Sequence, residues 1–135
     1  MNESEALRWR VWLELELEAV WLYPVIAARF DELRTSATAA FEAHRDLRDA
    51  VVSVLADADI EPPGPLVSYE AGDLSSVDEA RATAARLEQR LCASIAALSG
   101  EVGGDERERV VRELRATAVR AVSWGAAPEA FPGLD

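Results

Sequence analysis

Residues 7–33 read LRWRVWLELELEAVWLYPVIAARFDEL, and this stretch decides the fold. It holds three of the four tryptophans of the chain, together with Tyr23 and Phe30. Its apolar positions recur at alternating steps of four and three, a spacing typical of a long helix in an antiparallel bundle. This seam passes through Trp12, Glu16, Ala19, Tyr23, Ile26, Phe30 and Leu33. Further apolar stripes lie beside the seam, so we expect the helix to contact more than one neighbour.

Start and stop signals along the chain predict four helices. They cover residues 4–34, 36–59, 76–99 and 105–123. Ser76 followed three residues later by Glu79 is a capping-box pattern, and Asp105 with Glu108 repeats it. Pro24 falls inside the first helix, where we expect a kink and no break, because the apolar stripe keeps its phase on both sides.

Between the second and third helices the helical pattern stops. Residues 60–75 read IEPPGPLVSYEAGDLS, and their prolines exclude a continuous helix. The first two helices are joined by a short turn near Thr35, which makes them an antiparallel hairpin. The sequence thus predicts an all-α fold in one domain, residues 1–135. We expect a ferritin-like antiparallel four-helix bundle with a long Pro-rich linker between helices 2 and 3.

The C-terminal tail, residues 124–135, is too apolar to remain in solvent. Trp124, Phe131 and Leu134 are its large apolar residues, and we expect them to dock on the end of the bundle. The single cysteine, Cys92, lies among apolar residues and is expected to serve packing. It can form no internal disulfide, which agrees with the cytoplasmic location expected for a chain without a targeting segment.

The net charge of −11 narrows the possible partners. An acidic surface repels phosphate backbones and anionic lipid, so we expect neither nucleic acid nor membrane as a partner. No apolar run approaches the roughly 20 residues of a membrane span. Gly-rich phosphate loops, Cys-x-x-Cys pairs and nucleophile elbows are also missing from the sequence, which does not favour an enzyme.

Several short segments occur in an order that extends nearly from end to end. They are Glu16 to Tyr23, His44-Arg45, Arg48-Asp49, Glu61-Pro62-Pro63, Tyr69, Ala85-Arg86-Leu87-Glu88, Arg120-Ala121, Trp124-Gly125 and Phe131-Pro132-Gly133-Leu134. In this order and spacing the chain resembles an actinobacterial family of small ferritin-like domains of unknown function (DUF4439). The resemblance implies a ferritin-like bundle and no established activity. The family pattern often places a histidine after the glutamate of helix 1, where this chain has Leu17, so no metal role is carried over.

A complete di-iron site is excluded by the histidine count. Such a bundle needs a Glu-x-x-His motif on each of two helices, and this chain has one histidine, His44. Counting from a turn near Thr35 places Glu16 level with residues 52–55, where no metal ligand is present. A metal site made of Glu16, His44 and Glu88, holding iron or another divalent metal, stays as the alternative.

The same counting brings four polar residues together at the middle of the bundle. They are Tyr23, His44, Arg48 and Glu88, with Thr117 or Arg120 of the fourth helix nearby. We interpret them as a structural network in which Arg48 pairs with Glu88 and His44 bonds to Tyr23. The alternative interpretation is a pocket for a small ligand.

We therefore expect a non-enzymatic structural or interaction module that lacks a complete di-iron site and uses no cofactor. The alternative is a metal-dependent redox or small-molecule-binding bundle that uses Glu16, His44 and Glu88. Helix 1 has more apolar surface than three bundle partners can cover, so we also expect a homodimer through this helix. Trp9, Leu13 or Trp21 would then lie near the contact.

Overall fold

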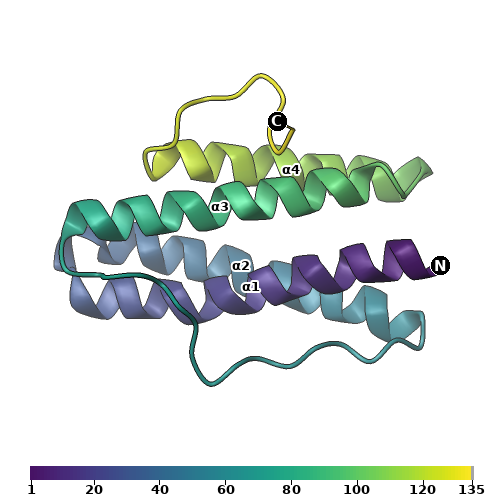
Figure 1. The fold of residues 1–135 in the computed structure, drawn as a ribbon, viewed down its shortest axis with the longest axis horizontal. Helices are drawn as coiled ribbons and strands as arrows, with labels where there is room; N and C mark the ends of the chain where they lie inside the picture. The colour runs from purple at the N-terminus through teal and green to yellow at the C-terminus, as the bar shows by residue number, and fades with distance from the viewer. Residues whose placement is uncertain (135) are drawn as a thin grey trace.

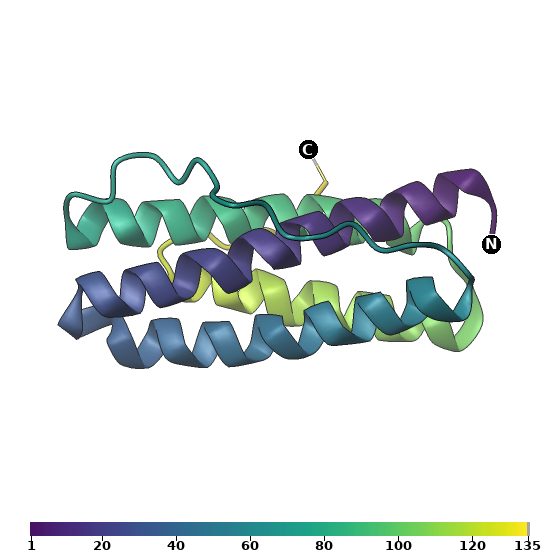
Figure 2. The same ribbon diagram turned by 90° about the horizontal axis from the view of Figure 1, so that it is seen from below.

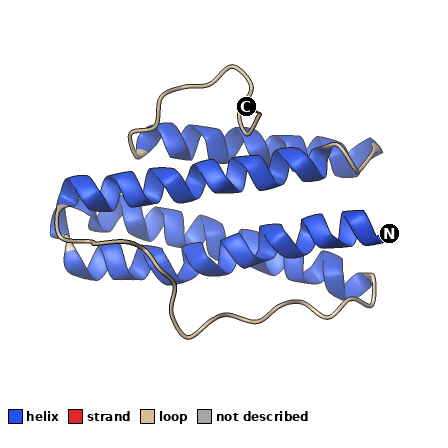
Figure 3. Cartoon of the chain, viewed as in Figure 1, coloured by secondary structure: helices blue, strands red, loops and turns tan. Residues whose placement is uncertain are grey.

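The computed structural model describes residues 1–134 and consists of four long helices joined by loops (Figures 1 and 3). The helices are α1 (Glu3–Arg29), α2 (Arg34–Asp57), α3 (Val77–Ser99) and α4 (Gly104–Ser123). A short 3-10 turn, η1 (Asp31–Leu33), joins α1 to α2. Residues 1–134 contain no β-strand, so the predicted all-α bundle is confirmed.

The helices form two antiparallel hairpins, α1 with α2 and α3 with α4, and α1 also packs on α3 (Figure 1). The loop after α2 runs back along the length of the bundle beside α1, as Figures 1 and 2 both show. As a result, α3 begins at the same end as α2 and runs parallel to it. A single long crossover of this kind is the connectivity of ferritin-like bundles.

The crossover loop is held to the bundle by specific contacts. The ring of Tyr69 packs on Trp21 of α1 with 5.6 Å between ring centroids. Arg29 Nη1 donates a hydrogen bond to the Leu74 carbonyl at 3.2 Å, and Thr83 Oγ1 donates to the Ala71 carbonyl at 3.4 Å. The loop therefore packs on the outer side of α1, for which the sequence analysis had named no neighbour within the bundle.

This covering bears on two of the three residues that we expected near a homodimer contact on helix 1. Trp9 is 3% exposed and Leu13 is 0% exposed within a single chain. Trp21 is half-buried and Leu7 of the same helix is 56% exposed, so part of the apolar surface of α1 stays accessible. The homodimer through helix 1 therefore stays a prediction.

Helix boundaries differ from the prediction by one or two residues at several ends, as at both ends of α2, and by more at the end of α1. The first helix ends at Arg29 and not near residue 34, because Phe30 adopts an extended conformation (φ −130, ψ 103) before η1. Within α1 the helix continues through Pro24 without a break. At α4 the expected cap Asp105 lies inside the first turn, and the N-cap is Gly103, whose extended backbone (φ −137, ψ 174) starts the helix.

The cap of α3 is confirmed. Ser76 accepts a hydrogen bond from the Glu79 backbone N–H at 3.1 Å. The carboxylate of Glu79 reaches back to Ser75, whose hydroxyl donates to it at 2.7 Å. These bonds satisfy backbone N–H groups at the start of α3, so the crossover loop ends and the helix begins at a defined residue.

Of the three large apolar residues predicted to dock the C-terminal tail, only Trp124 is buried. Trp124 is 3% exposed and stacks on Tyr23 with 5.7 Å between ring centroids. Phe131 and Leu134 are 72% and 65% exposed, so the prediction that they dock on the bundle end was wrong. Residues 126–134, which we call the arm, arch over α4 and return toward α3 (Figure 1). Asp135, the last residue of the predicted tail, lies outside the described residues.

None of the helices in the described range has a stretch long and apolar enough to cross a membrane.

The contrast between Trp124 and Phe131 gives a first prediction. Trp124→Ala should lower the free energy of unfolding by ~3–5 kcal/mol, because it removes a buried aromatic and leaves a cavity beside Tyr23. The matched variant Phe131→Ala should change it by no more than ~0.5 kcal/mol, as expected for an exposed position. Urea denaturation of the two variants measures both values. Equal losses in the two variants would contradict this placement of the tail.

Candidate functional site

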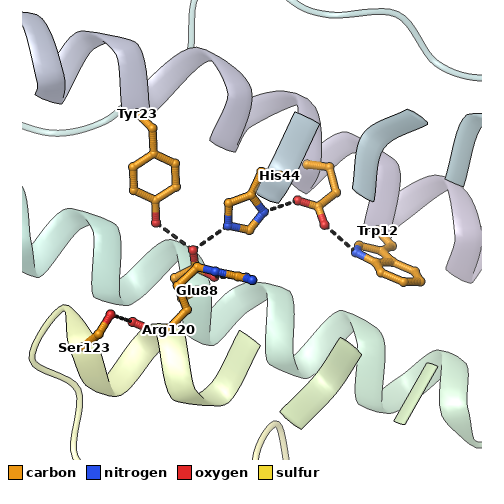
Figure 4. Close-up of polar contacts among 7 residues, drawn as sticks. Trp12, Tyr23, His44, Glu88, Arg120 and Ser123 are labelled. Atoms are coloured by element: carbon orange, nitrogen blue, oxygen red, sulfur yellow. Dashed lines mark hydrogen bonds and ion pairs between the residues drawn. The ribbon is translucent and has the colours of Figure 1, made fainter. Parts of the chain in front are cut away.

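A single imidazole connects two carboxylates at the centre of the bundle (Figure 4). Glu16 lies on α1, His44 on α2 and Glu88 on α3, and all three side chains are 0% exposed. His44 Nδ1 is hydrogen-bonded to Glu16 Oε1, and His44 Nε2 lies 2.6 Å from Glu88 Oε1. Both ring nitrogens are therefore used inside the protein.

Two aromatic donors from α1 complete this arrangement. Trp12 Nε1 donates to Glu16 Oε2 at 2.9 Å, and Tyr23 OH donates to Glu88 Oε1 at 2.7 Å. We call the five residues Trp12, Glu16, His44, Glu88 and Tyr23 the polar chain. It links α1, α2 and α3 by hydrogen bonds alone.

The aromatic rings around His44 are stacked. The Tyr23 ring lies 5.5 Å from the imidazole, centroid to centroid, with an interplanar angle of 8°. Trp124 in turn stacks on Tyr23, with an interplanar angle of 22°. This packing fixes the imidazole plane and excludes water from the polar chain.

The electrostatics of the polar chain favour a charged His44. Burial alone would lower the pKa of His44, but the hydrogen bonds to Glu16 and Glu88, with their negative charges, raise it to about 9. At pH 7 the ring is then an imidazolium that donates from both nitrogens. Burial, followed by the charge of Glu88, raises the pKa of Tyr23 well above its usual value, so this phenol remains a neutral donor.

The fourth helix contributes a second positive charge. Arg120 Nη1 lies 3.6 Å from Glu88 Oε2, which is beyond hydrogen-bond distance. Neither atom has a hydrogen-bond partner among residues 1–134, and the same is true of the buried Thr117 Oγ1. Two carboxylates thus face one imidazolium and one guanidinium, and the charges of the site balance.

The structure brings together three of the four residues predicted for a polar layer. Tyr23, His44 and Glu88 meet, but Arg48 does not, and its expected pairing with Glu88 was wrong. Arg48 Nη2 pairs instead with Asp49 Oδ1 at 2.9 Å, with 30% of its side chain exposed. Positions 47 and 48 lie at the two edges of the buried stripe of α2 and are both half-buried, with Leu47 packed against the core. Arg120, on α4, is the guanidinium near Glu88.

The level predicted for Glu16 was also wrong. We placed it beside residues 52–55, yet it meets His44. The turn is centred on η1 and not near Thr35. Moving the turn of an antiparallel hairpin by one residue changes the pairing by two. A turn about three residues earlier therefore moves the level of Glu16 by about six residues along α2, most of the way to His44.

Trp12 was not recognised as a partner of Glu16, although the sequence carried a signal. The two residues are four apart on α1, the spacing at which helical side chains meet. A glutamate on a buried seam needs a donor, and the indole N–H one turn away is the nearest candidate.

The alternative metal ligands Glu16, His44 and Glu88 do come together, but their geometry does not suit a metal. The two carboxylates lie on opposite sides of the imidazole, one at each ring nitrogen, so the three residues share no central point. Within residues 1–134 no group of three or more His, Cys, Asp or Glu side chains is arranged to hold a metal ion.

Comparison with known proteins identifies the family. Residues 9–135 match the family model described as a domain of unknown function (DUF4439). The chain belongs to this family. The fold of this DUF4439 chain is similar to the crystal structure of a conserved hypothetical protein, rv2844, from Mycobacterium tuberculosis, with a TM-score of 0.85 and 20% identity. The match covers 92% of this chain and 96% of that one, and at this identity it shows the fold alone. No curated protein matches the sequence.

The charge of His44 gives this DUF4439 domain a defined pH dependence. The folded-state pKa of about 9 lies above the unfolded value of 6.5, so the stabilisation is fully present below pH 6.5 and is lost as pH rises to about 9. A shift of this size corresponds to about 3 kcal/mol. The difference in unfolding free energy between the wild type and His44→Gln should therefore shrink between pH 6.5 and 9.

Urea denaturation at several pH values measures this difference, and the chain has no other histidine to confuse it. A difference that stays constant from pH 6 to pH 9 would show that His44 does not gain a proton on folding.

Proposed function

We propose that this domain is a non-enzymatic structural or interaction module that lacks a complete di-iron site, and whose polar chain sets the register of its helices. The observation that supports this proposal is that both ring nitrogens of His44 are already bonded within the protein. Both of its ring nitrogens are paired with carboxylates, and all three side chains are 0% exposed. No nitrogen of the imidazole is left to bind a ligand or to move a proton to a substrate.

The surface pockets support the same proposal. One pocket of about 720 Å³ lies on α3, α4 and the arm, and another of about 440 Å³ lies where α2 meets the start of α4. Neither is lined by a residue of the polar chain. A catalytic group must reach its substrate, and the polar chain faces neither pocket.

The energetic role of the polar chain follows from its burial. Removing charges from water is costly, and their mutual attraction offsets this only when the hydrogen bonds are well formed. An arrangement of this kind adds little net stability but penalises every other packing of the helices, because a slipped register would leave charges unpaired. This specificity suits a small bundle that is rich in alanine.

A metal-dependent redox or small-molecule-binding bundle that uses Glu16, His44 and Glu88 is the second candidate. Its support is the presence of these three donor types, buried at the middle of a bundle with ferritin-like connectivity. It would require His44 to lose a proton and one carboxylate to leave its ring nitrogen. Iron or another divalent metal would then be the group bound.

A substitution that removes one charge at nearly constant side-chain shape separates the two candidates. On the structural proposal Glu88→Gln should cost ~3–5 kcal/mol, because it leaves Arg120 and His44 without their buried partner. The control Glu18→Gln removes a carboxylate paired with the exposed Arg90 and should cost ~0–1 kcal/mol. Chemical denaturation gives both values.

Metal analysis of the protein purified without chelator or affinity tag completes the test. The proposal expects no stoichiometric metal in the wild type. Bound metal that disappears in Glu88→Gln, with little loss of stability, would establish the metal-dependent candidate instead.

A further inference from the structure

A pocket of about 720 Å³ lies beneath the arm, between α3 and α4. We call it the arm pocket. Its walls carry mostly small side chains, among them Ala93, Ala118, Ala121, Ala126 and Ala127. Its volume is within the ~300–1,000 Å³ of small-molecule sites. Phe131, the aromatic residue of the arm, is 72% exposed and does not line the pocket, so the arm borders this space without filling it.

The arm is held against α3 at a position that only glycine can occupy. Gly133 has a φ of +79, and a Cβ atom there would lie 2.7 Å from the Cys92 carbonyl carbon and 3.0 Å from Ala93 Cα. Both contacts are to backbone, which cannot move aside as a flexible side chain would. The close approach of Gly133, which lines the arm pocket, therefore holds this end of the arm against α3.

The α3 edge of the arm pocket carries hydrogen-bond donors. Arg86, Gln89 and Arg90 are spaced by three and four residues, so they share one face of α3. Arg90 is held by Glu18 through two bonds of 2.9 and 3.3 Å. Arg86 donates only to the Thr83 hydroxyl, at 3.1 Å, and pairs with no carboxylate among residues 1–134. It is therefore the cation of the pocket that can receive an acid.

We propose that the arm pocket binds a small molecule with an apolar body and one acidic head group. The apolar body would lie among the alanines and prolines of α3, α4 and the arm, and the acid would accept hydrogen bonds from Arg86 and Gln89. Glu129 is the one carboxylate among the lining residues, and it opposes an anion. The polar chain has no part in this site, so the proposal is independent of the function proposed above.

Decanoate is a suitable probe, and decyltrimethylammonium, with the same chain and the opposite charge, is its matched control. Isothermal titration calorimetry with the full chain should show one decanoate bound and the cation bound about tenfold more weakly or not at all. Arg86→Gln should weaken decanoate binding about tenfold, as expected for loss of a charge-assisted hydrogen bond. Glu129→Gln should strengthen it, because it removes the opposing charge.

Gly133→Ala tests the role of the arm. It should abolish decanoate binding while the helical circular dichroism is retained, because the arm would be displaced from α3. Gly64→Ala is the control, since no atom lies within 4 Å of its added Cβ, and it should bind as the wild type does. Absence of decanoate binding, equal affinity for the two probes, or full binding by Gly133→Ala would each overturn the proposal.

Discussion

The rest of the structure depends on one buried positive charge, the imidazolium of His44, held between Glu16 and Glu88. Three helices meet at this ring, and Arg120 of the fourth helix lies near the Glu88 carboxylate. The aromatic rings of Tyr23 and Trp124 exclude water from it. Because an unpaired charge in this environment is costly, the helices have one acceptable register, and the surrounding apolar packing follows that register.

The fold could be predicted from the sequence because its signals are local. The seam of residues 7–33 and the Ser76–Glu79 cap depend on neighbours a few residues away. The cap predicted the start of α3 correctly, and the seam predicted a long first helix, although that helix ends at Arg29. The polar chain depends on which residues of neighbouring helices lie side by side. A turn predicted a few residues too late shifts every predicted partner along α2. Glu16 was therefore given partners only in the alternative metal site, and Glu88 was assigned Arg48, where Arg120 of α4 lies near it. Phe131 was misjudged for a related reason, since hydrophobicity does not show whether a tail finds a surface to cover it.

The molecule separates its two unusual features in space. The polar chain is closed and charge-balanced at the middle of the bundle, where it specifies how the helices pack. The arm pocket lies on the outer side of α3 and α4, where small side chains and a glycine contact leave space beside a guanidinium. Selection for a stable core and selection for a ligand could act on these regions independently, because they share no residue.

The central claim is that His44 carries protons on both ring nitrogens at neutral pH. Nitrogen-15 NMR of the imidazole at pH 7 measures this directly, because protonated and unprotonated ring nitrogens resonate far apart. We expect Nδ1 and Nε2 both to show the protonated shift, each with a slowly exchanging hydrogen coupled to it. An unprotonated shift at either nitrogen would mean that the ring is neutral and that the helices do not meet at a buried positive charge.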